Sequence, residues 1–201
     1  MSNIIFDKRF GNDRLQNIKK DVFEKVWKSA LNTLIKFGLT ELPVSLMTIC
    51  KTSGIRILNN NTINILQNDE YGICIKQGEQ WFIIVDFTNT LQNIRFTVAH
   101  ELGHIFLAHD RYYTSKGNIV NPNVEIEADM FATFLLMPSC VLRGIGAFTP
   151  EKISTQCNVS LNAAKSQIEL LEFLQLHNIF LSNPLELKVY DQFLNFIESC
   201  N

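Results

Sequence analysis

The sequence predicts an α+β fold in which helices surround a small sheet. Apolar residues recur at helical spacing over residues 17–37 and again before residue 109. Two segments with strand character flank a glycine turn within residues 71–86. Hydrophobic residues make up 46% of the 201-residue chain and charged residues 19%, so the chain can bury a sizeable core.

The first expected helix covers residues 17–37 and ends at a glycine, which can close a helix in the left-handed conformation. Pro43 is expected to open a second helix that ends near Gly54. Residues 54–58 then form a strand, and the asparagine-rich residues 59–64 form a loop.

A hairpin and a long helix are expected in the middle of the chain. Residues 71–76 and 80–86 are rich in β-branched and aromatic residues and flank a glycine, which predicts the hairpin. The helix is capped by Asn89 or Thr90 and ends near His109.

After a polar loop over residues 110–123, a helix over residues 124–137 is ended by Pro138. Glycines and a proline then mark the most suitable boundary in the chain. We therefore expect a first domain over residues 1–145 and a C-terminal helical segment over residues 146–201.

The C-terminal segment is similar in pattern to a helix-turn-helix, with its turn at residues 158–160. The second helix carries one lysine, Lys165, against Glu169 and Glu172. DNA binding leaves a basic footprint, and this segment is acidic. We therefore expect a packing or substrate-docking role, and no direct nucleic-acid binding.

Composition narrows the cellular setting. The net charge of −2 gives no general attraction to nucleic acid or to anionic membranes. The N-terminus lacks the apolar run of a signal peptide, and no segment is long and apolar enough to span a bilayer. The five cysteines include no C-x-x-C pair, which is typical of reduced thiols. These features predict a cytoplasmic protein with no membrane partner.

The run HELGH at residues 100–104 carries the strongest chemical signal. His100 and His104 lie four residues apart, so on a helix both imidazoles can reach one ion. Glu101 lies beside them and can act on a bound water without binding the metal, and Gly103 leaves room for close packing. The H-E-x-x-H pattern is typical of zinc metalloproteases. The alternative is a helix with two structural histidines and a solvated glutamate.

A catalytic zinc site needs three protein ligands and an open position. Glu125 and Asp129 share one face of the next helix by their spacing of four residues. Glu125 can bind the metal, and Asp129 can accept a hydrogen bond from a ligand histidine. Glu127 points about 200° away on an ideal helix, and it remains the alternative third ligand because helix starts are uncertain by a residue or two.

The runs RFTVAHELGH at residues 95–104 and EIEADMFATFLLMP at residues 125–138 closely resemble the ImmA/IrrE family of metallopeptidases. That family often has asparagine where Asp129 stands. The resemblance covers about residues 20–140. It implies a zincin-like metallopeptidase core, a Zn²⁺ ion and a glutamate as third ligand. It also implies a protein substrate such as a repressor encoded nearby on a mobile element, or a repressor-like regulator of a stress response.

In the expected mechanism, Glu101 takes a proton from the zinc-activated water and passes it to the leaving amine. His109, Arg111, Tyr112 and Tyr113 are all candidates to stabilise the oxyanion, and the sequence does not choose among them. The expected function is a zinc-dependent endopeptidase that cuts a specific regulatory protein. The alternatives are a non-proteolytic zinc-binding regulator that binds a partner or DNA, and one half of a toxin–antitoxin pair. Manganese or another divalent ion could replace zinc.

Overall fold

The computed structural model describes residues 20–67, 70–109, 122–176 and 183–200. The described elements are α1 (Lys20–Lys36), α2 (Leu46–Thr52), β1 (Arg56–Asn59), α3 (Asn60–Ile63), β2 (Gly72–Gln77), β3 (Gln80–Val85), α4 (Leu91–Phe106), α5 (Pro122–Leu136), α6 (Ser139–Gly144), α7 (Pro150–Cys157), α8 (Leu161–Leu176), α9 (Pro184–Gln192) and α10 (Leu194–Ser199). The predicted α+β class is confirmed.

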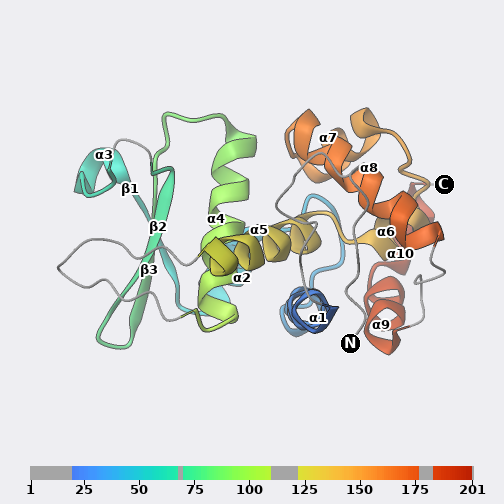
Figure 1. Cartoon of the computed structure of the whole chain (residues 1–201), viewed down its shortest axis with the longest axis horizontal. Coiled ribbons are helices and arrows are strands. Elements are labelled where there is room, and N and C mark those ends of the chain that lie inside the picture. The colour runs from blue at the N-terminus through green and yellow to red at the C-terminus, as the bar shows by residue number, and fades with distance from the viewer. Residues whose placement is uncertain (1–19, 68–69, 110–121, 177–182, 201) are drawn as a thin grey trace.

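The sheet is small and lies at one end of the molecule (Figure 1). Its strand order is β1-β3-β2, with β1 parallel to β3 and β2 antiparallel to β3 as in the predicted hairpin. Successive side chains of a strand point to opposite faces. Cys74, Ile83 and Val85 belong to the main core, whereas the cross-strand partners Ile73 and Ile84 are buried apart from it. The face of the sheet that carries Cys74, Ile83 and Val85 packs against α4.

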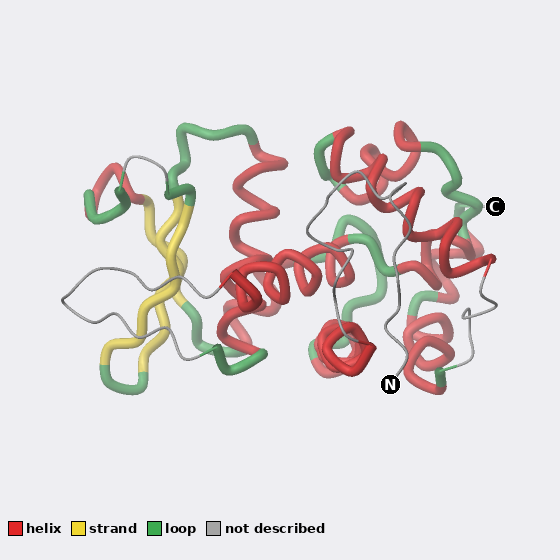
Figure 2. Tube along the Cα trace, viewed as in Figure 1, coloured by secondary structure: helices red, strands yellow, loops and turns green. Residues whose placement is uncertain are grey.

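Helix α4 stands beside the sheet. Helix α5 crosses α4 and leads toward the C-terminal helices (Figures 1 and 2). Helix α1 packs along α5, and α9 packs on α1. Gln192 Nε2 of α9 donates a hydrogen bond to the Leu34 carbonyl of α1 at 2.9 Å. One set of buried apolar side chains extends from α1 to α10. The domain division after residue 145 stays a prediction.

Helix α2 begins later than predicted. Ser45, not Pro43, caps it, because the Ser45 hydroxyl accepts a hydrogen bond from the Thr48 backbone N–H at 3.3 Å. A proline ring has no side-chain acceptor for the first turn. The helix therefore begins at Leu46.

The asparagine-rich loop expected over residues 59–64 contains the single-turn helix α3. Asn59 Oδ1 accepts from the Asn61 N–H at 3.0 Å, and Asn64 ends the turn in the left-handed conformation with φ 55°. Asparagine suits both tasks. The prediction of a loop, which was based on composition alone, missed these two caps.

Two further helix ends depart from the expected positions, and one helix was not expected. Thr90 caps α4, which ends at Phe106 and not near His109. Helix α5 includes Pro122 in its first turn. Helix α6 was not predicted, and it follows at once because the Pro138 carbonyl accepts from the backbone of its first turn. Within the described residues, no helix has the length and apolar character needed to cross a membrane.

Candidate metal centre

Helices α4 and α5 bring together the three side chains that the sequence predicts as metal ligands. His100 Nε2 lies 2.9 Å from His104 Nε2 and 3.2 Å from Glu125 Oε2. His104 Nε2 lies 3.6 Å from Glu125 Oε1. Among the described residues these three form a group whose ligand atoms all lie within 4.8 Å of one another.

The spacing of these donors fits a single ion. Ligands about 2.0–2.1 Å from a tetrahedral zinc ion lie about 3.3 Å from one another. The donor separations of 2.9, 3.2 and 3.6 Å in the structure bracket that value. Two imidazoles and one carboxylate also form a donor set that catalytic zinc uses, with a fourth position left for water.

His100 is oriented by a carboxylate, as the sequence predicts. Its Nδ1 lies 2.8 Å from Asp129 Oδ1, one turn beyond Glu125 on α5. Burial disfavours the charged ring, but the hydrogen bonds with Asp129 and Glu125 outweigh burial and raise the pKa of His100 to about 9. In the metal-free protein the ring is therefore protonated at neutral pH. A positive charge is thus favoured where a metal ion would bind.

Glu101 is buried, with 2% of its surface exposed, and its charge also helps to raise the pKa of His100. It lies where α4 meets the start of β2. A Cβ atom at Gly72 would collide with the Thr97 methyl group and would stand 3.8 Å from Glu101 Cγ. Glycine at position 72 therefore lets the edge strand approach Glu101 closely.

The outer side of His104 meets a second group of polar residues. His104 Nδ1 lies 3.1 Å from His109 Nδ1, and His109 Nε2 lies 3.3 Å from Glu127 Oε2. Lys25 of α1 approaches the same Glu127 oxygen at 3.2 Å. Burial lowers the pKa of His109, which keeps its ring neutral at neutral pH.

This arrangement bears on two alternatives that the sequence leaves open. Glu127, the alternative third ligand, contacts His109 and Lys25, and it does not belong to the group formed by the other three candidates. His109, a candidate oxyanion donor, lies on the side of His104 away from His100. The other oxyanion candidates, Arg111, Tyr112 and Tyr113, lie outside the described residues. Sequence reasoning missed the contact between His109 and Glu127; the only available signal was a third histidine five residues after His104.

Gly103 sets the separation of the two helices that carry the candidate ligands. A Cβ atom there would lie 3.1 Å from Ala128 Cα and 3.2 Å from both Ala128 O and Phe131 Cβ. The predicted close packing at Gly103 is thus present, and it is made against the backbone of α5. Any larger residue would have to move α5, and Glu125 with it.

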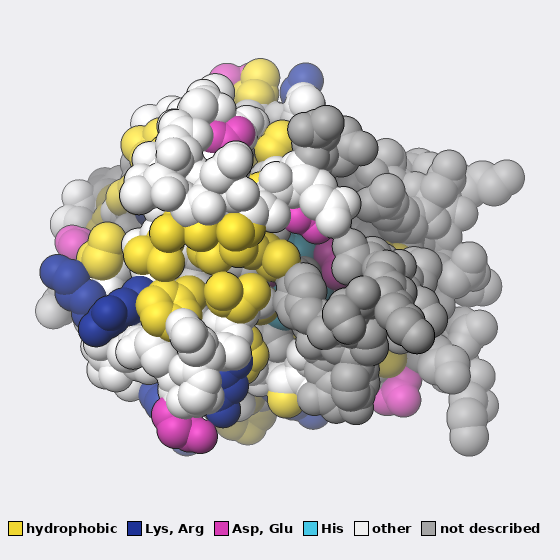
Figure 3. Space-filling model, turned by 90° about the vertical axis from the view of Figure 1, so that its left-hand side faces the viewer, with side chains coloured by type: hydrophobic (Ala, Val, Ile, Leu, Met, Phe, Trp, Pro, Cys, Tyr) yellow, Lys and Arg dark blue, Asp and Glu magenta, His cyan; other side chains and the backbone are white. Residues whose placement is uncertain are grey.

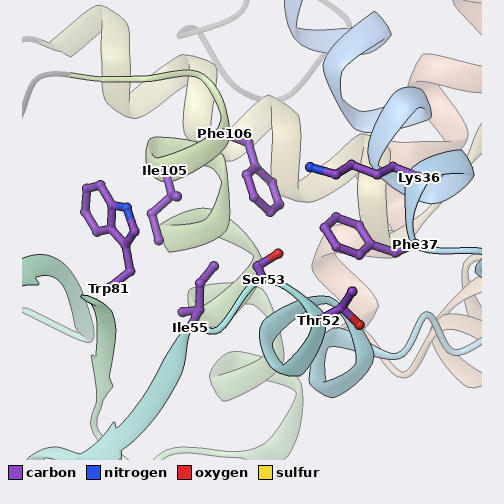
Figure 4. Close-up of a pocket in the computed structure, with 8 residues that line it drawn as sticks. All are labelled: Lys36, Phe37, Thr52, Ser53, Ile55, Trp81, Ile105 and Phe106. Carbon is purple, nitrogen blue, oxygen red and sulfur yellow. The ribbon is translucent and has the colours of Figure 1, made fainter. Parts of the chain in front are cut away.

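The candidate metal centre is partly accessible through Glu125, whose side chain is 34% exposed. Figure 3 shows histidine and acidic side chains together on the face that bears the sheet, at the border of an apolar area. A separate hollow of about 310 Å³ lies at the C-terminal end of α4 (Figure 4). It is lined by Lys36, Phe37, Thr52, Ser53, Ile55, Trp81, Ile105 and Phe106. This lining contains no carboxylate or imidazole, so it lacks the donor groups that the histidine cluster brings together.

Comparison with known proteins agrees with this geometry. The IrrE N-terminal-like domain, a peptidase family, matches residues 50–169, which is more than half of the chain and includes both helices of the centre. The metallopeptidase ImmA of Bacillus subtilis (strain 168) is 32% identical over 122 residues, which cover 55% of this chain and 67% of that protein. The resemblance found in the sequence is thereby confirmed. The chain belongs to the IrrE N-terminal-like family and is a metallopeptidase.

Proposed function

We propose that this chain is a zinc-dependent endopeptidase that cuts one specific regulatory protein of its own cell, such as a helix-turn-helix repressor. In this proposal His100, His104 and Glu125 hold the metal, and Glu101 is the general base. The observation that carries it is the convergence of the three donor atoms, all within 4.8 Å of one another, directly beside the buried Glu101.

The proposed roles follow from the position of each group. A bound zinc ion would supply the Lewis acid that activates water and polarises the peptide carbonyl. Glu101 follows His100 in the chain and accepts a proton from the attacking water, then delivers it to the leaving amine. Asp129 orients His100 by accepting a hydrogen bond, at 2.8 Å, from the ring nitrogen that does not face the other ligands.

The substrate class rests on a different kind of support. A metallopeptidase acts on a protein or peptide, and the chain's family membership shows that it is a metallopeptidase. The narrower choice of a repressor-like regulator comes from the resemblance to the ImmA/IrrE family. The acidic α8, with Glu169 and Glu172 against Lys165, favours a role in docking a protein over contact with DNA.

The experiment compares the parent protein with Glu101→Gln. Each is loaded with zinc and incubated with the product of any helix-turn-helix repressor gene found beside this chain's gene, and fragments are identified by mass spectrometry. Glutamine keeps the volume of the side chain but removes the base, so cleavage should fall by about 10²–10⁴-fold while metal content is unchanged. Glu151→Gln, an exposed position on α7, is the matched control and should cut normally.

The same variants separate an enzyme from a binder. The readout in cells is the response that the regulatory protein controls. If this response persists in full with Glu101→Gln while His100→Ala abolishes it, the metal is structural and the chain acts by binding. Loss of the response with both variants supports proteolysis.

A further inference from the structure

The two ring nitrogens of His104 face different groups, and this asymmetry is the starting point. Nε2 faces the other candidate ligands, 2.9 Å from His100 Nε2 and 3.6 Å from Glu125 Oε1. Nδ1 faces away from them and lies 3.1 Å from His109 Nδ1. Thus, whatever binds at Nε2, the orientation of the His104 ring depends on the contact with His109.

The proton positions along this contact follow from its geometry. If His104 gives Nε2 to a metal ion, its ring N–H is on Nδ1 and must be donated to His109. His109 Nδ1 is then the acceptor, because two N–H groups cannot face each other at 3.1 Å. The N–H of His109 is therefore on Nε2, where Glu127 Oε2 accepts it at 3.3 Å. This assignment gives the chain of hydrogen bonds one direction, from His104 outward.

The backbone places His109 for this contact. Helix α4 ends at Phe106 with Leu107 as its C-cap, and Ala108 adopts the left-handed conformation with φ 52°. The His109 N–H then donates to the His104 carbonyl at 3.0 Å, so the chain folds back along the last turn of the helix. A left-handed alanine is uncommon. The two rings meet edge to face, 5.1 Å between centroids.

Water has little access to these groups. The side chains of His104, His109 and Glu127 are 0%, 6% and 14% exposed. Lys25 closes the outer end by its contact with Glu127, although this side chain is 56% exposed. A hydrogen bond that water cannot replace is costly to lose.

We propose that His109 is a positioning residue of the metal centre. Through its acceptor nitrogen it fixes the ring of His104 with Nε2 turned toward His100 and Glu125, and Glu127 holds His109 in the required tautomer. His100 is oriented directly by Asp129, so the two ligand histidines use different supports. The inference rests on the metal site of the proposed function, and it gives Glu127 a role other than that of a ligand.

The first test measures zinc affinity of the full chain by competition with a chelator. His109→Phe keeps an aromatic ring but has no acceptor, and it should weaken zinc binding by about 10–100-fold, as expected when an outer-shell partner is lost. His109→Asn places an amide oxygen near the position of Nδ1 and should recover most of the affinity. Parent-like affinity in His109→Phe, or equal losses in both variants, would overturn the proposal.

Glu127→Gln tests the outer link, with Glu24→Gln of α1, whose side chain is 40% exposed, as the matched control. The amide oxygen can still accept from His109 Nε2, so zinc affinity should fall less than in His109→Phe. A loss as large as that of His104→Ala would indicate that Glu127 is a ligand and would refute its proposed role of holding His109. If His104→Ala itself keeps zinc, the proposed metal site is wrong; if only His109→Phe keeps it, the positioning role alone is wrong.

The third readout needs no substitution. Long-range ¹H–¹⁵N spectra of the zinc-loaded parent report which nitrogen of each histidine carries the proton. The proposal requires the proton of His104 on Nδ1 and that of His109 on Nε2. A His109 ring protonated on Nδ1 would contradict it.

Discussion

Gly103→Ala tests whether the close approach of α4 and α5 builds the metal centre. The added methyl group would lie 3.1 Å from Ala128 Cα and 3.2 Å from both Ala128 O and Phe131 Cβ. Two of these atoms belong to the α5 backbone and cannot rotate away, so the helices must separate slightly. Overpacking of this kind costs about 1–3 kcal/mol. The better helix propensity of alanine returns about 1 kcal/mol. We therefore expect a net loss of about 1 kcal/mol in the free energy of unfolding.

The same shift has a consequence for metal binding. Both ligand histidines are on α4, whereas Glu125 is on α5, so a wider spacing moves the carboxylate away from the imidazoles. Zinc affinity should fall together with stability.

Urea unfolding of the metal-free protein measures stability without the contribution of bound metal. Chelator competition measures zinc affinity separately. Asn32→Gly and Asn32→Ala, at an exposed position of α1, calibrate the propensity difference without a packing change. If Gly103→Ala gains the full propensity difference and binds zinc as well as the parent, the packing argument is refuted.

Two further predictions concern pH and DNA. The pKa of His100 in the metal-free protein is about 9, so the ring holds a proton below that pH which zinc must displace. Zinc affinity should therefore rise about tenfold per pH unit up to about pH 9 and level off above it; chelator competition at several pH values checks this, and a flat profile would contradict it. The proton's contribution to the stability of the metal-free protein has the opposite trend, being complete below the unfolded pKa of about 6.5 and lost as pH rises through 9. The chain should also show weak or no binding to duplex DNA at physiological salt, because α8 sets Glu169 and Glu172 against Lys165. Fluorescence anisotropy with labelled duplexes measures this, and tight sequence-specific binding would show that the helix-turn-helix pattern has been misjudged.

The parts of the candidate metal centre whose geometry is local could be predicted from the sequence. A spacing of four residues places His100 and His104 one turn apart on any helix, and the same spacing places Asp129 one turn beyond Glu125. Helix α4 needed only a correct phase, which its apolar positions supplied. The meeting of α4 with α5 came from family resemblance, since periodicity does not show which faces of two helices touch.

The contacts of His109 could not be predicted in this way. Its position depends on Ala108 in a left-handed conformation, where sequence rules expect glycine or asparagine. Its partner Glu127 is 18 positions away along the chain, and Lys25 is 102 positions from Glu127. Three segments must pack before these side chains meet. Helix α3 was missed for a different reason: its capping residues Asn59 and Asn64 are local, and an interpretation based on composition alone overlooked them.

The charge distribution explains why the centre uses two kinds of support. Asp129, Glu125 and Glu101 all act on His100, and each favours its positive charge. A divalent cation would therefore enter a site that is already negative and would take the place of the His100 proton. A further bare carboxylate against His104 would add to that negative charge in a buried position, which is costly. His109 avoids this cost because its neutral ring accepts a hydrogen bond from His104 Nδ1–H. The charged Glu127 lies farther out, where the exposed Lys25 contacts it. Thus His104 is oriented by a hydrogen bond without another anion being placed beside it.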